Sequence, residues 1–308
     1  MANPALTEGA AALPGAEFWH WLALLKPRVM TLVVFTGLVG LLIAPGRLHP
    51  VLAFAAVLSI AVGAGAAGAI NMWYDRDIDA VMRRTARRPI PAGAVLPGDA
   101  LAFGIVLAAG SVLVMALATN LVAAAILAVS ILFYVLVYTM WLKRSTPQTI
   151  VIGGAAGAFP PLIGWAAVTG HVGLYPLILF AIVFFWTPPH FWSLSLYACG
   201  DYTRAGVPML PVVRGLRTTR RHIVAYAALL LPVSLSPWLL GLAGPVYGIA
   251  ASVLGLAFLA STIRVLFDGD AAGVSRTGDA PARFAFRVSL AYLALLFAAV
   301  LVDHWVAL

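Results

Sequence analysis

Oxygen-bearing side chains recur at every fourth residue in the stretch that follows the second long apolar run. Asn71, Asp75 and Asp79 are spaced i, i+4 and i+8, so on a helix they share one face over about two turns. Carboxylates this close repel one another unless a cation lies between them. Mg²⁺ binds through one or two carboxylates together with waters and substrate phosphate oxygens. The stripe formed by these three residues therefore predicts a magnesium site.

Basic side chains accompany the stripe. Arg84 and Arg88 follow it in the chain, and Lys143 and Arg144 come at the end of a later apolar run. Guanidinium groups bind phosphate oxygens through paired N–H donors, and ammonium groups bind them as point charges. A carboxylate stripe beside such groups is the arrangement expected of a metal–diphosphate site.

A second polar segment follows the sixth apolar run and carries Asp201 and Arg204. The stripe, the Lys143–Arg144 pair and this segment follow the second, fourth and sixth runs. They therefore lie on the same side of a membrane if each run crosses it. This placement allows the three segments to converge on one cavity.

Two other interpretations of the stripe stay open at this point. Charged residues at the end of a membrane helix often form only a solvated collar, and arginines there also orient the chain. Carboxylates in membrane proteins also mark the ion pathways of transporters. A secondary transporter, however, predicts polar groups and broken helices near the bilayer midplane, whereas these carboxylates gather at one surface.

Composition identifies the class of protein. Of the 308 residues, 63% are hydrophobic and only 10% are charged, and the mean hydropathy is +1.00; a soluble domain carries about 25% charged residues. These values exclude a water-soluble enzyme, a disordered chain and a fibrous protein. The single cysteine, Cys199, excludes a disulfide framework and a cysteine metal cluster. The sequence therefore predicts an all-α integral membrane protein.

Charge placement predicts the orientation of this protein in the membrane. Apolar runs of about 20 residues, the length that spans a bilayer, lie near 28–45, 50–72, 99–118, 121–141, 150–169, 174–195, 222–242, 245–267 and 284–302. All of the 19 Lys and Arg residues except Arg47 fall on one side of these nine spans. The positive-inside rule then places the N-terminus in the cytoplasm and the C-terminus outside. The net charge of +8 thus reflects topology and not a nucleic-acid partner.

The first 25 residues contain no Lys or Arg, unlike a secretory signal or a transit peptide. We therefore expect a bacterial cytoplasmic (inner) membrane protein. Residues 1–25 are expected to form a cytoplasmic N-terminal segment, and residues 26–308 a single polytopic membrane domain.

Four sequence strings resemble a known family. The run NMWYDRDIDAVMRRTARRPIPAG (71–93) resembles the first aspartate-rich motif of the UbiA-type intramembrane prenyltransferases. LKRSTPQTIVIGGAAGAFPPLIGW (142–165), TPPHFW (187–192) and DYTRAGVPMLPVV (201–213) are similar to the branch of that family that farnesylates heme. The likeness runs from about Lys26 to the final span. It implies a nine-helix bundle around a central cavity open near the cytoplasmic side.

The resemblance also implies an activity, namely transfer of the farnesyl group of farnesyl diphosphate to a vinyl group of heme B, giving heme O for terminal oxidases. Heme B is then a substrate and Mg²⁺, bound with the diphosphate, a cofactor. The protein environment would be membrane lipid, with heme A synthase or oxidase assembly factors as possible partners. The implied metal ligands are Asn71, Asp75, Asp79 and Asp201. The implied substrate contacts are Lys143, Arg28, Arg84, Arg88, Arg144, Arg204 and His190, with Lys26 as a further candidate.

One departure from the wider family bears on the metal site. Many members carry two aspartates four residues apart in the second motif, whereas here the positions are Asp201 and Ala205. The heme-farnesylating branch is similar in this respect. His190 is interpreted either as a heme contact, to the iron or to a propionate, or as a packed residue. The alternatives for the whole chain are a UbiA-type enzyme acting on a quinone precursor such as 4-hydroxybenzoate, a secondary transporter, and a structural oxidase subunit.

Overall fold

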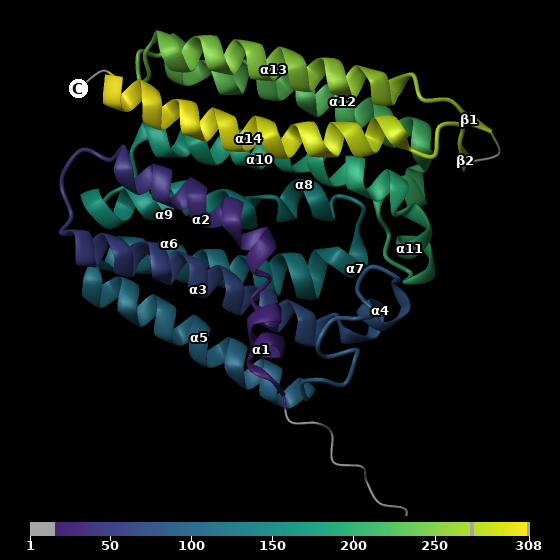
Figure 1. The fold of residues 1–308 in the computed structure, drawn as a ribbon, viewed down its shortest axis with the longest axis horizontal. Coiled ribbons are helices and arrows are strands. Elements are labelled where there is room, and N and C mark those ends of the chain that lie inside the picture. The colour runs from purple at the N-terminus through teal and green to yellow at the C-terminus, as the bar shows by residue number, and fades with distance from the viewer. Residues whose placement is uncertain (1–15, 272–273, 307–308) are drawn as a thin grey trace, which may run out of the picture.

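The computed structural model describes residues 16–271 and 274–306, which form a bundle of long helices running side by side (Figure 1). Within these residues, eight helices are long and apolar enough to cross a membrane, and a ninth span results if α1 and α2, bent by 53°, count as one. The predicted all-α membrane bundle of about nine spans is thus confirmed.

The elements of the described chain follow in order. They are α1 (Phe18–Leu24), α2 (Pro27–Leu42), α3 (Pro50–Tyr74), α4 (Arg76–Val81), α5 (Pro97–Ala118), α6 (Leu121–Leu132), the π-helix η1 (Phe133–Leu142), α7 (Lys143–Ser145), α8 (Thr149–Gly153), α9 (Ala155–Thr169), α10 (Leu174–Tyr197), α11 (Cys199–Arg204), α12 (Leu210–Leu239), α13 (Pro245–Leu266), β1 (Asp270–Ala271), β2 (Val274–Ser275) and α14 (Ala280–Val306). β1 and β2 pair antiparallel.

Prolines set the start of several spans. α2, α3, α5 and α13 each begin at a proline, which lacks an N–H and has a φ suited to the first helical position. At the other end of α9, Gly170 takes a positive φ of 72° and terminates the helix. These signals explain why the predicted and observed bounds agree closely for most spans.

The helices form two groups joined by α2 and α9 (Figure 1). α3, α5 and α6 pack together on one side, and α10, α12, α13 and α14 on the other. α2 and α9 contact each other so closely that a Cβ on Gly40 would lie 2.1 Å from the Pro161 carbonyl oxygen. A Cβ on Gly164 would likewise lie 2.0 Å from the Gly37 carbonyl oxygen. Small residues therefore allow the central helix pair to form, as is common in membrane bundles.

Two elements differ from the sequence-based expectation. α12 begins at Leu210, well before the expected start of the seventh span at 222, and is kinked at Gly215, where φ is 79°. The basic residues at its start hid this helix from a hydropathy scan. α1 lies within the segment expected to precede the membrane domain; the rest of that segment, 1–15, is outside the described residues.

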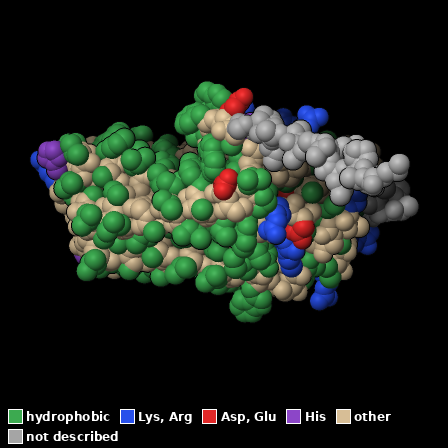
Figure 2. Space-filling view, turned by 90° about the horizontal axis from the view of Figure 1, so that it is seen from below, with side chains coloured by type: hydrophobic (Ala, Val, Ile, Leu, Met, Phe, Trp, Pro, Cys, Tyr) green, Lys and Arg blue, Asp and Glu red, His purple; other side chains and the backbone are tan. Residues whose placement is uncertain are grey.

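Short elements gather at one end of the bundle. α4, α7, α11 and the β1–β2 hairpin lie there, opposite the C-terminus (Figure 1). A hydrophobic cluster joins the two predicted polar segments, since Ile78 and Met82 pack with Tyr202, Val207 and Met209. Figure 2 shows Lys and Arg concentrated toward this end and hydrophobic side chains over the remaining flank. The convergence expected from the sequence is therefore present.

Candidate active site

The Asn71–Asp75–Asp79 stripe lies at the junction of α3 and α4. Asn71 is in the last turn of α3, Asp75 links the two helices and Asp79 is in α4. Their exposed fractions are 3%, 0% and 2%. A solvated collar would leave such side chains in water, and unpaired buried carboxylates are strongly unfavourable. The stripe is therefore a buried polar site with partners of its own.

Three hydrogen bonds hold the Asn71 amide, and a fourth orients its partner Thr139. Its Nδ2 donates to Asp75 Oδ2 at 2.7 Å and to Thr139 Oγ1 at 3.1 Å. Thr139 Oγ1 in turn donates to the Tyr134 carbonyl at 2.8 Å, so it can only accept from Asn71. Asn71 Oδ1 faces Lys26, whose Nζ donates to it at 2.7 Å. The amide oxygen is thereby presented to a positive charge.

Thr139 lies in the π-helix η1, a rare helical form that occurs mainly as single turns and often at functional sites. η1 also ends directly before Lys143. Its Tyr138 ring packs on Gly153, where a Cβ would come within 2.2 Å of Tyr138 Cδ2. Neither the π-helix nor the role of Thr139 was predicted, because hydropathy does not distinguish a π-helix from an α-helix.

Replacing Thr139 with valine tests this network. The change keeps the shape of the side chain but leaves one N–H of buried Asn71 without an acceptor, which typically costs about 1–3 kcal/mol. We expect a lower thermal unfolding midpoint for Thr139→Val than for the wild type in detergent. Thr139→Ser, which keeps the hydroxyl, should lie close to the wild type; equal midpoints for the valine and serine variants would contradict the network.

Asp75 is paired with two basic residues of α7. Lys143 Nζ donates to Asp75 Oδ2, and an Arg144 guanidinium nitrogen lies 3.7 Å from Oδ1. Oδ1 accepts no hydrogen bond in the structure. The carboxylate thus faces a positive charge at each oxygen, but only Oδ2 accepts a hydrogen bond, so Oδ1 keeps its lone pairs for a cation.

Asp79 and Asp77 point to different partners. Arg88 donates to Asp79 Oδ2 at 2.6 Å. Exposed Asp77 instead receives two hydrogen bonds from Arg144, at 2.7 and 2.8 Å. These bonds lower the pKa of the Asp77 carboxyl to about 2. Arg144 therefore ties α7 to α4 through Asp77, while Asp79 shares the buried face of the stripe with Asp75.

Asp201 is ion-paired with Arg204 on α11. Both line a cavity of about 330 Å³ at this end of the bundle, together with Arg83, Arg84, Tyr197, Ala198, Gly200 and Arg283. No three Asp, Glu, His or Cys side chains of the described residues are grouped closely enough to hold a metal ion. Asp201 therefore lies at the same end as Asp75 and Asp79 without forming a three-carboxylate cluster with them.

His190 is buried between aromatic rings of α10 and α14. It stacks on Trp186 and Phe286 with ring centroids 4.2 and 4.5 Å apart. Its Nδ1 is 2.7 Å from Ser289 Oγ, which itself donates to the Phe286 carbonyl at 2.7 Å. The Ser289 proton is therefore used, so Nδ1 carries the imidazole proton and Nε2 keeps its lone pair.

The first span contributes Lys26 rather than Arg28. Arg28 is exposed, and its side chain makes no hydrogen bond or ion pair with the described part of the chain. Lys26 precedes Pro27 and adopts a positive φ of 52°, a conformation that costs a non-glycine residue about 1–3 kcal/mol and often marks a functional site. The contact to Asn71 bridges 45 positions in the chain, which no local pattern predicts.

The donor set at the stripe fits Mg²⁺. It offers carboxylate and amide oxygens, the ligands that this ion prefers, and Asp75 Oδ1 is an open donor atom. One or two protein carboxylates are enough for Mg²⁺ when substrate phosphates complete its coordination. The absence of a larger acidic cluster from the described residues is compatible with that mode of binding.

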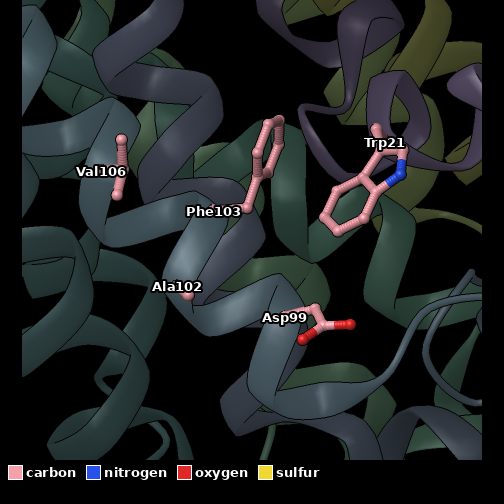
Figure 3. Close-up of a pocket in the computed structure, with 5 residues that line it drawn as sticks. All are labelled: Trp21, Asp99, Ala102, Phe103 and Val106. Carbon is pink, nitrogen blue, oxygen red and sulfur yellow. The ribbon is translucent and has the colours of Figure 1, made fainter.

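A larger cavity, of about 530 Å³, lies on the outer flank between α1 and α5. Figure 3 shows its lining, in which Trp21 and Phe103 face each other and Asp99 lies at the start of α5. None of the predicted site residues lines it. The chemistry expected from the sequence therefore belongs to the stripe and the arginine-lined cavity.

Comparison with known proteins identifies the fold family. The model of the UbiA prenyltransferase family matches residues 33–290. The chain belongs to this family. A UbiA homolog from Archaeoglobus fulgidus bound to DMAPP and Mg²⁺ shares the fold with a TM-score of 0.67 and 20% identity, over 91% of this chain and 99% of that one.

Relatives within the UbiA family are much closer in sequence. The protoheme IX farnesyltransferase of Granulibacter bethesdensis is 67% identical over 96% of this chain and 94% of its own length. That of Acidiphilium cryptum is 62% identical over 99% and 100%. The resemblance inferred from the four sequence strings is confirmed, and the chain is a prenyltransferase of the UbiA type.

Proposed function

We propose that this protein transfers the farnesyl group of farnesyl diphosphate to a vinyl group of heme B, adds a hydroxyl to the same group and releases diphosphate. The observation that carries the proposal is the buried Asn71–Asp75–Asp79 stripe, which is neutralised by basic side chains suited to a diphosphate. Relatives that share 55–67% sequence identity with this chain are named protoheme IX farnesyltransferase, which supports heme B as the acceptor.

The bond changes balance as follows. The bond between C1 of the farnesyl group and the diphosphate oxygen breaks, and the electron pair leaves with the diphosphate. C1 then bonds to the terminal vinyl carbon, and the carbon next to the porphyrin ring becomes a cation. Water adds its oxygen to that carbon and releases a proton. The hydrophobic interior of the bundle suits the farnesyl chain and excludes water until this last step.

The residues of the site divide this work. Asn71, Asp75 and Asp79 would hold Mg²⁺, which supplies positive charge to the leaving diphosphate when bound. Asp201 is proposed as a further ligand once it separates from Arg204. Lys26, Arg88 and Lys143 now contact the stripe, and they are placed to neutralise diphosphate oxygens instead.

The remaining basic candidates are proposed to act less directly. Arg144 positions α7 through its bonds to Asp77. Arg84 and Arg204 line the cavity beside Asp201 and are proposed to bind an anionic group of a substrate. Arg28 is proposed as a surface contact for an incoming substrate.

His190 is proposed to contact the heme substrate through its unprotonated Nε2. We expect His190→Ala to raise the KM for heme B by about tenfold, because one lost hydrogen bond or equivalent contact changes an affinity by about that factor. The KM for farnesyl diphosphate should change little. Steady-state kinetics with each substrate varied in turn measure this. A rise of both KM values by the same factor would make His190 a packing residue.

We also propose the setting of this activity. The charge distribution favours a bacterial cytoplasmic membrane, with the N-terminus inside and the C-terminus outside. Residues 26–308 are proposed to act as one membrane domain that follows a cytoplasmic segment, residues 1–25. The product would pass to heme A synthase or to oxidase assembly. A reporter fused to the C-terminus that is active only outside the cytoplasm tests the orientation, and an inactive reporter would reverse it.

Product analysis in cells tests the proposed function. The chain is produced in a bacterial host that makes heme B but does not farnesylate it, and the extracted hemes are identified by mass. We expect a heme enlarged by one farnesyl group and one hydroxyl group. Cells that produce the folded protein and contain heme B alone would overturn the proposal.

A further inference from the structure

The cavity beside Asp201 is lined by four arginines from three separate segments. Arg83 and Arg84 come from the connection after α4, Arg204 from α11 and Arg283 from α14. Asp201 is the one acidic side chain in the lining, so four positive charges and one negative charge leave a net charge of +3. Like charges are held together here without enough carboxylates to neutralise them, which indicates that the cavity receives an anion.

These arginines are distinct from the basic side chains of the stripe. Lys26, Arg88 and Lys143 each contact Asn71, Asp79 or Asp75. Arg83, Arg84 and Arg283, in contrast, form no ion pair with a carboxylate of the described residues. A diphosphate held at the stripe therefore has basic partners of its own, which leaves Arg83, Arg84 and Arg283 for another anionic group.

Aromatic rings connect the cavity to His190. The Arg283 guanidinium lies 4.7 Å from the centre of the Tyr197 ring. Tyr197 contacts Phe286 edge to face at 6.2 Å, and Phe286 stacks on His190. Tyr197 lines the cavity, and the packed rings of Phe286 and His190 lead from it along α10 and α14 into the apolar interior of the bundle. A ligand with one anionic edge and a flat apolar body matches this sequence of groups.

We propose that the arginine-lined cavity binds the propionate carboxylates of the heme substrate. This inference rests on the proposed function. The two propionates lie on the edge of the macrocycle opposite the vinyl groups, so anchoring them at the bundle end directs the vinyl edge inward. Arginine forks are suited to carboxylates, and about 330 Å³ is at the lower limit for small-molecule pockets. The cavity therefore holds the charged edge and not the whole macrocycle.

Pairing variants with a modified substrate tests the assignment. Heme B and its dimethyl ester, in which both propionates are neutral, are compared as acceptors for the wild type and for the variant Arg83→Gln/Arg283→Gln. In the wild type, esterification should raise the KM for the acceptor at least about tenfold, as expected for lost charge-assisted bonds. In the variant, the KM for heme B should rise by a similar factor, and esterification should add little. The KM for farnesyl diphosphate should stay unchanged.

Arg217→Gln is the matched control, because Arg217 is an exposed arginine of the same end of the bundle that does not line the cavity. It should retain the wild-type KM for heme B and the full penalty for esterification. Arg83→Gln and Arg283→Gln are also made singly, so that a folding defect of the double variant does not hide the effect. Monodispersity in detergent checks each protein.

Heme binding without farnesyl diphosphate gives a second readout, by titration of the heme absorbance. We expect the dissociation constant of heme B to rise in the cavity variant and that of the ester to stay the same. A penalty for esterification that persists in the cavity variant would overturn the proposal. A variant in which only the KM for farnesyl diphosphate is raised would also overturn it and would assign the cavity to diphosphate. Failure of the wild type to bind or prenylate heme at all would instead overturn the proposed function.

Discussion

Asp75→Asn is expected to lower kcat for farnesyl transfer by at least about a hundredfold. The substitution keeps the shape of the side chain but removes the negative charge that neutralises Lys143 and would hold the metal ion. Loss of one well-placed charge contact in a site of this kind typically costs about a hundredfold to a thousandfold in kcat. Breaking a buried ion pair also destabilises the fold, so the unfolding midpoint should fall as well.

Asp77→Asn provides the matched control for this prediction. Asp77 lies two residues away, but its carboxylate is exposed and bonded to Arg144 outside the stripe. We expect it to retain most of the wild-type kcat. Rates are measured with purified protein of checked monodispersity. Near-normal transfer by Asp75→Asn, or an equal loss in both variants, would contradict the assignment of the metal site.

Lys143→Met is expected to have the second largest effect. The change preserves much of the apolar stem but removes the ammonium group, which now faces Asp75 and is placed to receive the leaving diphosphate. We expect kcat to fall by about a hundredfold or more, with a higher KM for farnesyl diphosphate and an unchanged KM for heme B.

The two substitutions should also be coupled. The double variant Asp75→Asn/Lys143→Met removes both charges of the pair. The decrease in its unfolding midpoint should therefore be smaller than the sum of the decreases in the two single variants, because the effects of substitutions in direct contact are not additive. Lys143→Arg should recover part of the activity because it keeps the charge. Strict additivity in stability would mean that the ion pair does not persist in solution.

The features that follow a local pattern could be predicted from the sequence. The spans depend on runs of apolar residues, and the stripe depends on helical spacing, so both required no knowledge of distant contacts. The meeting of the polar segments at one end of the bundle followed from their positions after the second, fourth and sixth apolar runs. α12 was placed too late because the basic residues at its start lower its hydropathy, although they are helical.

The partners of the stripe could not be predicted in the same way. Lys26 reaches Asn71 through a left-handed backbone conformation, and Thr139 reaches it through a π-helix. Both contacts join segments far apart in the chain. Arg144 was expected at the diphosphate, but its strongest bonds are to Asp77, which lies only two residues from Asp75 and on another face.

Competition between acceptors tests the central claim most directly. Purified protein receives farnesyl diphosphate and Mg²⁺ with equimolar heme B and 4-hydroxybenzoate, and the prenylated products are identified by mass with and without a chelator. We predict hydroxyethylfarnesyl heme as the product, its loss on chelation and its absence with Asp75→Asn. Prenylated hydroxybenzoate with unchanged heme B would contradict the account and assign the enzyme to quinone precursors.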